Sequence, residues 1–316
     1  MNNETWLIGT GQMAMDYAAV LKSLNKPFTV IGRGETKSRE FETQIGMEVI
    51  TGGIQNYLET KPTIPQKVIV ATNVEELQSI CKMLINYGVK DILIEKPGVA
   101  YPREINELAD IAQQTTGVNV LLAYNRRFYS SVLNAEKIIA EDGGLSSFNF
   151  EFTEWSHVIT AYPKTDADLN NWFLGNSTHV VDLAFYLGGQ PKDLSAYYAG
   201  SLDWHPSAAI FAGAGISEKG ALFSYQANWE APGRWVLELL TKKHRLIFKP
   251  MEKLQIQLIG SVAVNPVEID DSLDTEFKPG LYLQTKAFLE GDYNRFCTVE
   301  KQKQMINDVY IKMSGY

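Results

Sequence analysis

The sequence has little cysteine and no long hydrophobic run. Its two cysteines, Cys81 and Cys297, lie far apart in apolar stretches. Two thiols do not make a disulfide framework, and free cysteines are usually buried, so we expect internal, reduced thiols. No apolar stretch approaches the ~20 residues that a membrane-spanning helix needs. The N-terminus, Met1-Asn2-Asn3-Glu4, lacks the basic and apolar segments of a secretory leader, which predicts a cytoplasmic protein with no membrane partner.

An excess of positive charge is absent as well. The chain has 29 Lys+Arg against 37 Asp+Glu, a net charge of -8. A nucleic-acid partner requires clustered cations to neutralise phosphates, so this balance predicts that the chain does not bind nucleic acid. We interpret the short basic run Lys242-Lys243-His244-Arg245 as a solvated turn between strands. Hydrophobic residues make up 45% of the 316, enough for two domains at roughly 150 residues each.

The first third of the sequence alternates short apolar runs with helical patterns. Five apolar runs are interpreted as strands: residues 6–8, 28–31, 67–71, 91–95 and 118–122. Residues 74–87 carry apolar side chains at helical spacing, as at Leu77, Cys81 and Leu84. Strands that are apolar almost throughout and separated by helices are typical of a parallel sheet covered on both faces. We therefore predict an α/β Rossmann domain with a doubly wound parallel sheet over residues 1–122.

The rest of the sequence is patterned with a period of two. Apolar side chains alternate with polar ones over residues 223–230 and again over residues 254–258. This pattern indicates an antiparallel sheet with one covered face. Two helical stretches, 281–289 and 299–313, follow. We predict an α+β domain with a large, mostly antiparallel open sheet over residues 123–316.

A glycine-rich hexamer follows the first strand. It reads Gly9-Thr10-Gly11-Gln12-Met13-Ala14, the G-x-G-x-x-A form. The first glycine permits a tight turn, the second lets the backbone approach a pyrophosphate, and the small last residue lets helix and strand pack closely. Its position between a strand and a helix predicts a dinucleotide site rather than a plain glycine turn. Thr72 and Asn73, after the 67–71 strand, are predicted to lie under the cofactor, to cap the next helix, or both.

The residue after the second strand bears on the choice of dinucleotide. A site for NAD usually has Asp or Glu there, which bonds the ribose 2′-hydroxyl. This sequence has Arg33 between two glycines, with Thr36, Lys37 and Ser38 beyond. A planar guanidinium suits a 2′-phosphate. We therefore predict NADP(H) as the favoured cofactor, with NAD(H) as the alternative if Arg33 is only a surface turn residue.

Four further segments carry a family resemblance. They are Glu95-Lys96-Pro97 at a strand end, Tyr124-Asn125-Arg126-Arg127-Phe128 at the domain junction, His179-x-x-Asp182 followed by Leu187-Gly188-Gly189, and Trp229-Glu230-Ala231-Pro232-Gly233 in the sheet. Together with the hexamer, these segments resemble the Gfo/Idh/MocA family, the group around glucose–fructose oxidoreductase and inositol dehydrogenase. The resemblance covers essentially the whole chain. It implies a nicotinamide-dependent oxidoreductase acting on the hydroxyl or ketone group of a sugar, polyol or nucleotide-sugar.

The resemblance also implies roles for particular residues. Lys96 would lie beside the nicotinamide, with Glu95 at the same strand end in the cofactor site, and His179 would approach from the second domain. Hydride transfer requires a proton to leave or reach the substrate oxygen in the same step. A lysine can exchange it when burial and a nearby positive charge lower its pKa, whereas a histidine, with an ordinary pKa near ~6.5, needs no such help. We assign His179 as proton donor and acceptor and Lys96 as its positioning partner, and the reverse assignment stays open.

A further set of residues is predicted to contact the substrate: Arg126, Arg127, Trp172, Asn176 and Asp182. One of the two arginines would bind a carboxylate, phosphate or sugar oxygen, while the other is solvated. Asp182 would orient the imidazole of His179, one helical turn away, or only suit the helix dipole. No third ligand at a telling spacing accompanies these two residues, so we predict no metal site. Trp155, Tyr162 and Trp172 are candidates to stack on a sugar face or to pack in the interior.

The sequence departs from the family pattern just before His179. Many members have Asp four residues before this histidine and Gly two before it, where this chain has Gly175 and Ser177. The loss of a carboxylate puts the substrate in doubt more than the reaction class. Asn171, Asn176 and Ser177 are candidates to replace its contact with a substrate hydroxyl.

Two other functions stay open under the same resemblance. One is redox-assisted glycoside hydrolysis, and the other is a non-catalytic regulatory protein that senses the dinucleotide. The presence of both Lys96 and His179 favours an enzyme over the regulatory protein. In this family the open sheet pairs between subunits, and an exposed apolar face tends to be buried by association, so we expect a homodimer or homotetramer.

Overall fold

The computed structural model describes residues 4–161 and 164–316, which form two compact units. The first unit comprises the chain up to Asn125 together with Leu273–Gln304, and the second comprises Arg126–Ser272 together with Met305–Tyr316. The predicted boundary after residue 122 lies three residues before the division after Asn125. The return of Leu273–Gln304 to the first unit differs from the prediction, because a pattern read along the chain shows only contiguous domains.

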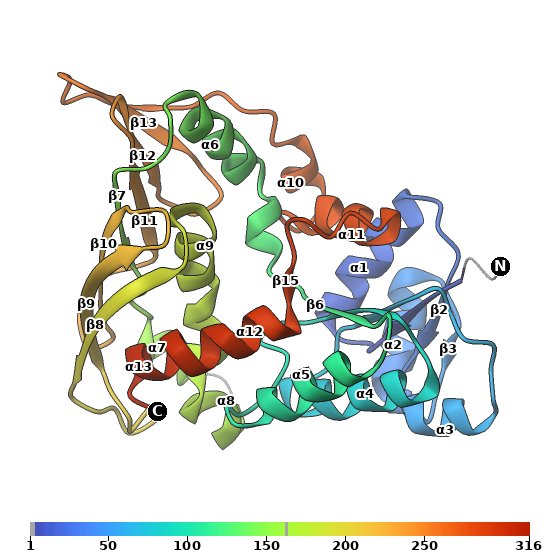
Figure 1. Ribbon diagram of the computed structural model, residues 1–316. Helices are drawn as coiled ribbons and strands as arrows, with labels where there is room; N and C mark the ends of the chain where they lie inside the picture. The colour runs from blue at the N-terminus through green and yellow to red at the C-terminus, as the bar shows by residue number, and fades with distance from the viewer. Residues whose placement is uncertain (1–3, 162–163) are drawn as a thin grey trace. The chain divides into compact units, whose positions relative to one another are not determined.

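The first unit is built around a seven-stranded sheet with the order β15-β6-β5-β4-β1-β2-β3 (Figure 1). Its strands are β1 (Thr5–Ile8), β2 (Phe28–Ile31), β3 (Val49–Ile50), β4 (Lys67–Val70), β5 (Asp91–Ile94), β6 (Asn119–Leu122) and β15 (Cys297–Thr298). Neighbouring strands run parallel, except that β15 is antiparallel to β6. Strands β1 and β4 are buried throughout, as apolar runs between helices predict. The predicted Rossmann domain is confirmed, and the strand order reverses between β1 and β4.

Helices flank this sheet in the first unit. They are α1 (Gln12–Ser23), α2 (Glu35–Ile45), α3 (Gly53–Glu59), α4 (Val74–Tyr87), α5 (Glu104–Gln114) and α11 (Leu281–Glu290). Helix α4 shows how local sequence sets its bounds. The carboxylates of Glu75 and Glu76 interact favourably with the positive end of the helix dipole at its N-terminus. The apolar face around Leu77 is buried, and the helix ends at Gly88, which has the left-handed conformation with φ 104°. Both cysteines are buried free thiols, as predicted.

The second unit contains an eight-stranded sheet with the order β14-β13-β12-β11-β7-β10-β9-β8. Its strands are β7 (Ser147–Glu151), β8 (Pro191–Ala199), β9 (Ile210–Ser217), β10 (Leu222–Asn228), β11 (Val236–Leu240), β12 (His244–Phe248), β13 (Gln255–Leu258) and β14 (Val264–Pro266). Neighbours are antiparallel except β7 and β10, which confirms the predicted mostly antiparallel sheet. The predicted turn over residues 242–245 is shorter than expected, because β12 begins at His244.

One face of this sheet is covered by helix. The second unit contains α6 (Ser130–Glu141), α7 (Ser156–Ile159), α8 (Asp166–Asn170), the π-helical turns η2 (Phe173–Ser177) and η3 (Ile306–Tyr310), α9 (Thr178–Gly188) and α13 (Ile311–Ser314). The chain passes between the units at the 3-10 turn η1 (Asn125–Phe128), at α10 (Ser272–Glu276) and at α12 (Val299–Met305). Phe185 of α9 packs edge-on against Phe148, Phe150 and Phe223, with ring centres 5.2 to 6.1 Å apart. These aromatic rings form the core of the second unit.

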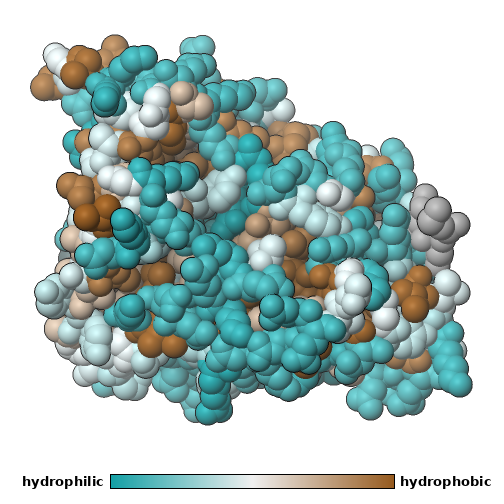
Figure 2. All heavy atoms as spheres, in the orientation of Figure 1, coloured by the Kyte–Doolittle hydropathy of each residue, from teal (hydrophilic) through white to brown (hydrophobic). Residues whose placement is uncertain are grey.

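The opposite face of the sheet carries exposed apolar side chains. Tyr197, Ile216 and Leu222 share this face and are 70%, 41% and 58% exposed. Ile259 and Val262 lie in the hairpin between β13 and β14, where Figure 2 shows apolar, brown atoms at the projecting tip. Within residues 4–161 and 164–316, no helix has the length and apolar character needed to cross a membrane.

Candidate functional site

A pocket of about 690 Å³ opens at the carboxyl ends of β1, β2 and β4. It is lined mainly by residues 9–13, 33–37, 52–56 and 71–73. This place is the switch point of the sheet, where strand order reverses and doubly wound folds bind their ligands. The structure therefore brings the predicted glycine hexamer, Arg33, Thr72 and Asn73 to one pocket.

The two glycines of the hexamer have different structural roles. Gly9 has φ 121°, and a Cβ there would lie 2.2 Å from the carbonyl oxygen of Ala71, so only glycine fits. Gly11 is the N-cap of α1, and a Cβ there would have no atom within 4 Å. The first turn of α1 thus presents its backbone N–H groups to open space, which suits an anion. Ala14 is fully buried, as close packing of α1 requires. These residues fit a dinucleotide pyrophosphate.

Arg33 lies at the rim of this pocket. Its side chain is 71% exposed and pairs with Glu76 of α4, which also lines the pocket. Thr36 and Lys37 at the start of α2 line the same pocket. Ser38 is buried, and its hydroxyl donates back to the backbone at 2.8 Å. Of the polar residues that follow Arg33, Thr36 and Lys37 are thus placed for a ligand and Ser38 is not.

Thr72 and Asn73 both reach the pocket. Asn73 occupies the N-cap position of α4, but its side chain makes no capping hydrogen bond. Asn73 therefore begins the helix through its backbone conformation, and its side-chain amide does not cap the helix. The contact of Thr72 and Asn73 with the cofactor stays a prediction.

Glu95 and Lys96 follow β5, and neither lines the 690 Å³ pocket. The Glu95 carboxylate accepts a hydrogen bond from the hydroxyl of Tyr17 at 2.9 Å, and Tyr17 also donates to Gln284 at 3.2 Å. Burial raises the pKa of Glu95, and the positive charge of Lys96 opposes that rise. Glu95 is thus anchored within the first unit beside Lys96, and its predicted contact with the cofactor stays a prediction.

Arg127 and Asp182 form an internal ion pair in the second unit. The Arg127 Nε donates to Asp182 Oδ2 at 2.8 Å, and Nη2 donates to the other oxygen. The two residues are only 6% and 3% exposed. This pair joins η1 to α9. The predicted substrate contacts of Arg127 and Asp182 stay predictions.

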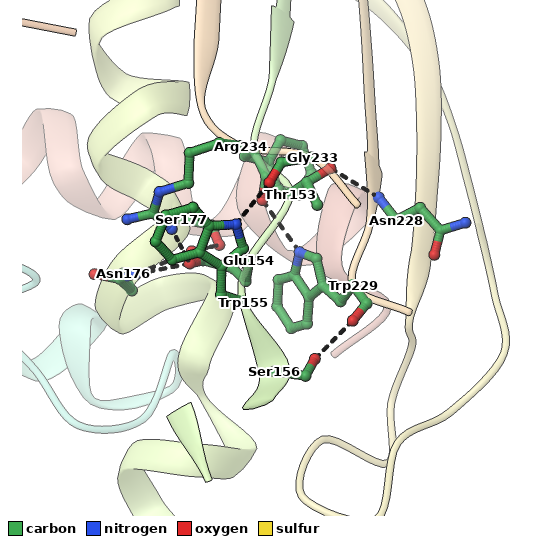
Figure 3. A network of polar contacts seen from close by, with 11 residues as sticks. Thr153, Glu154, Trp155, Ser156, Asn176, Ser177, Asn228, Trp229, Gly233 and Arg234 are labelled. Carbon is green, nitrogen blue, oxygen red and sulfur yellow. Dashed lines mark hydrogen bonds and ion pairs between the residues drawn. The ribbon is translucent and has the colours of Figure 1, made fainter. Parts of the chain in front are cut away.

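A buried carboxylate that the sequence interpretation missed lies in the same unit. Glu154 is 2% exposed and accepts hydrogen bonds from Ser177 Oγ at 2.8 Å and Asn176 Nδ2 at 3.0 Å (Figure 3). The guanidinium of Arg234 lies 3.4 Å from the same carboxylate. Burial raises the pKa of Glu154 to about 7, against the opposing effect of these hydrogen bonds and of Arg234. Asn176, predicted to contact substrate, thus has its amide nitrogen engaged by Glu154.

The register of β7 carries a signal that locates Glu154. Phe148, Phe150 and Phe152 face the interior at alternate positions, and Glu154 keeps the same parity beyond the strand end. A carboxylate at an inward position is rarely buried without partners. The Glu154 carboxylate therefore contacts Asn176 and Ser177. These two residues directly follow Gly175, the position at which the family pattern has an aspartate.

The predicted aromatic residues make packing contacts. Trp172 is half-buried and lies edge-on to Trp204 at 6.1 Å, and Trp155 donates its indole N–H to the Gly233 carbonyl at 2.8 Å. Tyr162 lies outside the described residues. Stacking of Trp155 or Trp172 on a sugar stays a prediction. Among the described residues, no group of three or more His, Cys, Asp or Glu side chains is placed to hold a metal ion.

The comparisons with known proteins agree with this geometry. A sequence model of the Gfo/Idh/MocA proteins, described as an oxidoreductase family with an NAD-binding Rossmann fold, matches residues 4–124. No curated protein sequence matches the chain significantly. Among solved structures, a levoglucosan dehydrogenase in complex with NADH and L-sorbose is 16% identical, with a TM-score of 0.77 over 97% of this chain and 94% of that one.

Two further solved structures are similar over their length. A UDP-N-acetylglucosamine 3-dehydrogenase from Acidithiobacillus ferrooxidans is 14% identical, with a TM-score of 0.73 over 100% of this chain and 98% of that one. A putative NADPH-dependent oxidoreductase from Desulfitobacterium hafniense is 15% identical, with a TM-score of 0.78 over 99% and 95%. Identities this low show a shared fold alone. Residues 4–124 of this chain are therefore similar to the NAD-binding Rossmann domain of the Gfo/Idh/MocA oxidoreductases.

Proposed function

We propose that the protein transfers a hydride between a nicotinamide dinucleotide and the hydroxyl-bearing or ketone carbon of a sugar, polyol or nucleotide-sugar. The observation that carries the proposal is the glycine-lined pocket at the start of α1, in a chain that also has Lys96 and His179. The family match supports the reaction class. The fold shared with levoglucosan and UDP-N-acetylglucosamine dehydrogenases supports the substrate class.

The chain's own residues bind the cofactor and move a proton. Residues 9–13 and the first turn of α1 hold the pyrophosphate, with Thr72 and Asn73 beside it. The nicotinamide, when bound, accepts or supplies the hydride. In the oxidative direction, His179 takes the hydroxyl proton as the hydride leaves the carbon, so negative charge does not build up on the oxygen. Lys96 positions that oxygen with its positive charge, and exchange of these two roles is the alternative assignment.

NADP(H) is the favoured cofactor in this proposal, and NAD(H) is the alternative. Arg33, Thr36 and Lys37 line the pocket beside the end of β2, and a guanidinium binds a phosphate through paired N–H donors. Arg33 already pairs with Glu76. A 2′-phosphate would therefore compete with that carboxylate for the guanidinium, while the ribose of NAD(H) would leave the pair undisturbed.

The chain also associates as a homodimer or homotetramer in this proposal. Tyr197, Ile216 and Leu222 are exposed together on one sheet face. Contiguous apolar patches of this kind usually mark protein interfaces. Because the same face repeats on each copy, a two-fold arrangement would bury it on both.

The test is hydride transfer by the purified protein. It is supplied with NADPH or NADH, or the oxidised forms, and a panel of sugars, polyols and keto-sugars, and the nicotinamide absorbance is followed. Lys96→Ala is expected to lower kcat by about 10²–10⁴-fold with the dinucleotide Kd little changed, because only the chemical step loses its partner. Lys90→Ala, an exposed lysine of the same unit, is the matched control and should retain full turnover.

Three outcomes would count against the proposal. Undiminished turnover by Lys96→Ala would contradict the catalytic assignment. Turnover of a glycoside without net change in the dinucleotide would indicate redox-assisted hydrolysis instead. A protein that binds dinucleotide tightly but transfers no hydride to any compound in the panel would indicate a regulatory protein.

A further inference from the structure

Two arginines contact the same indole ring in the second unit. The guanidinium carbon of Arg126 lies 4.9 Å from the ring centre of Trp235, and that of Arg234 lies 4.5 Å from it. The imidazole of His179 lies 6.1 Å from the same indole, centre to centre. The two guanidinium groups and His179, to which the proposed function assigns proton transfer, therefore lie around one indole ring.

Arg126 and its neighbour Arg127 differ in their contacts with carboxylates. Arg127 is neutralised by Asp182, whereas no carboxylate among the described residues lies within ion-pair distance of Arg126. The Nε atom of Arg126 is buried and has no acceptor in the part of the chain that the structure describes. The carboxylates of Glu154 and Glu252 act on Arg126 only through space. A buried guanidinium donor is thus left for an acceptor from outside the chain.

The second arginine adds to this positive charge. Burial lowers the pKa of Arg126, and the nearby charge of Arg234 lowers it further. The carboxylate paired with Arg234 is Glu154, which Ser177 and Asn176 also hold. Within the described residues, Glu154 is thus the one carboxylate within ion-pair distance of either guanidinium, while Glu252 acts on Arg126 only through space. An anion that binds between two partly buried positive charges reduces the repulsion between them.

Stacking on aromatic rings explains the position of Arg234, but it does not satisfy the buried donor of Arg126. Arg234 is 42% exposed and covers both Trp155 and Trp235, an arrangement that water can still solvate. Arg126 also lies near the ring of Tyr129, but stacking leaves its buried Nε donor unsatisfied. A guanidinium presents paired donors that match the two oxygens of a carboxylate or phosphate, which a neutral sugar hydroxyl does not offer.

We infer that Arg126 and Arg234 form an oxyanion-binding site at the Trp235 indole, near which His179 also lies, and that the sugar substrate carries a carboxylate or a phosphate ester. This inference rests on the proposed function, since it places the anionic group of the substrate near the proposed proton-transfer residue. It gives Arg126 the specificity role and leaves Arg127 a structural one.

The experiment is a calorimetric titration of the full chain, with saturating NADPH or NADH present. The probes are D-glucuronate, D-glucose 6-phosphate, UDP-glucose and uncharged D-glucose. A charged probe is expected to bind at least about tenfold more tightly than glucose, and added KCl should weaken that binding. Arg126→Gln is expected to remove the preference, and Arg126→Lys, which keeps the charge but not the fork, should restore only part of it. Arg245→Gln, an arginine paired with Glu238 elsewhere in the second unit, is the matched control.

The set of probes that bind identifies the anionic group that the site accepts. Binding of glucuronate alone indicates a carboxylate, and binding of glucose 6-phosphate or UDP-glucose indicates a phosphate. Equal binding of glucose and the charged probes, or a charged-probe affinity unchanged in Arg126→Gln, would overturn the inference, and so would the absence of binding by every charged probe. Because wild-type binding and its salt dependence are measured directly, a variant that fails to fold does not remove the test.

The same titrations separate this inference from the proposed function. A protein that oxidises or reduces a neutral sugar with NADPH, with no preference for charged ones, keeps the oxidoreductase assignment and loses the anion site. A protein that binds glucuronate or glucose 6-phosphate through Arg126 but transfers no hydride keeps the anion site and loses the assignment.

Discussion

Arg126 and Arg127 are adjacent in the sequence and have opposite environments. Arg127 is buried against Asp182, while Arg126 lies on Trp235 with a buried donor left unsatisfied within the described residues. Sequence predicted that one of the two would meet the substrate and could not say which one. The 3-10 turn η1 sets their different contacts, because it directs the Arg127 side chain toward α9.

Arg33 gives the first prediction at the scale of the residue. Arg33→Ala is expected to raise the KM for NADPH by about 10–100-fold and to leave the KM for NADH nearly unchanged, because only the 2′-phosphate loses its charged partner. Steady-state kinetics with each dinucleotide measures both values. Arg39→Ala, an exposed arginine further along α2, is the control. An unchanged KM for NADPH would show that Arg33 does not bind the 2′-phosphate.

Glu154 gives a prediction about pH. Its pKa is raised from 4.5 to about 7 by burial, so the folded state holds a proton that the unfolded chain releases at lower pH. The stability of the parent relative to Glu154→Gln should therefore be highest below about pH 4.5 and fall as pH rises to about 7, by about 3 kcal/mol in all. Urea unfolding of both proteins at several pH values measures the difference.

The matched control for that prediction is Glu230→Gln, at an exposed carboxylate of the same unit. Its unfolding free energy should follow the parent at every pH. If Glu154→Gln also ran parallel to the parent, Glu154 would titrate at its ordinary value, and the burial argument would fail.

At the scale of the element, helix α9 and strand β7 approach closely. Phe148 stacks on Phe150 and Phe223, with ring centres 6.5 and 5.4 Å apart, and Phe185 of α9 packs against all three. A Cβ at Gly188 would lie 2.3 Å from the ring of Phe148. Because the ring is fixed by its neighbours, it has little room to yield.

Gly188→Ala is therefore expected to destabilise the second unit by about 1–3 kcal/mol through overpacking. Gly175→Ala is the matched control, since a Cβ at Gly175 would have no atom within 4 Å, and its effect on stability should be small. Chemical denaturation of both variants compares the two sites. A Gly188→Ala protein as stable as the parent would mean that α9 shifts freely against β7.

At the scale of the whole molecule, the chain leaves the first unit at Asn125 and returns to it for Leu273–Gln304. The returning segment adds β15 to the edge of the parallel sheet beside β6, and its Gln302 donates to the Pro97 carbonyl, just after Lys96, at 3.0 Å. A segment more than 170 residues away in sequence thus supports the strand end that carries the predicted catalytic lysine.

The oligomeric state is the prediction at this scale. Light scattering is expected to give two or four times the 35.4 kDa mass of one chain. Leu222→Glu should shift the protein toward the monomer, because it places a charge on the exposed apolar face of β10, and Leu222→Met should not. A monomeric parent protein would contradict the proposed association.

By family resemblance, the sequence supplied the candidate pair Lys96 and His179. By itself it determined the two-sheet architecture and the glycine turn after the first strand. These depend on local chemistry: glycines after a strand, apolar runs between helices and a period of two are all visible in neighbouring residues. Tertiary structure decided the rest. It paired Asp182 with Arg127, and it buried Glu154 beside Asn176 and Ser177. Such contacts join residues 22 to 55 positions apart, and only packing of the elements sets which charges meet.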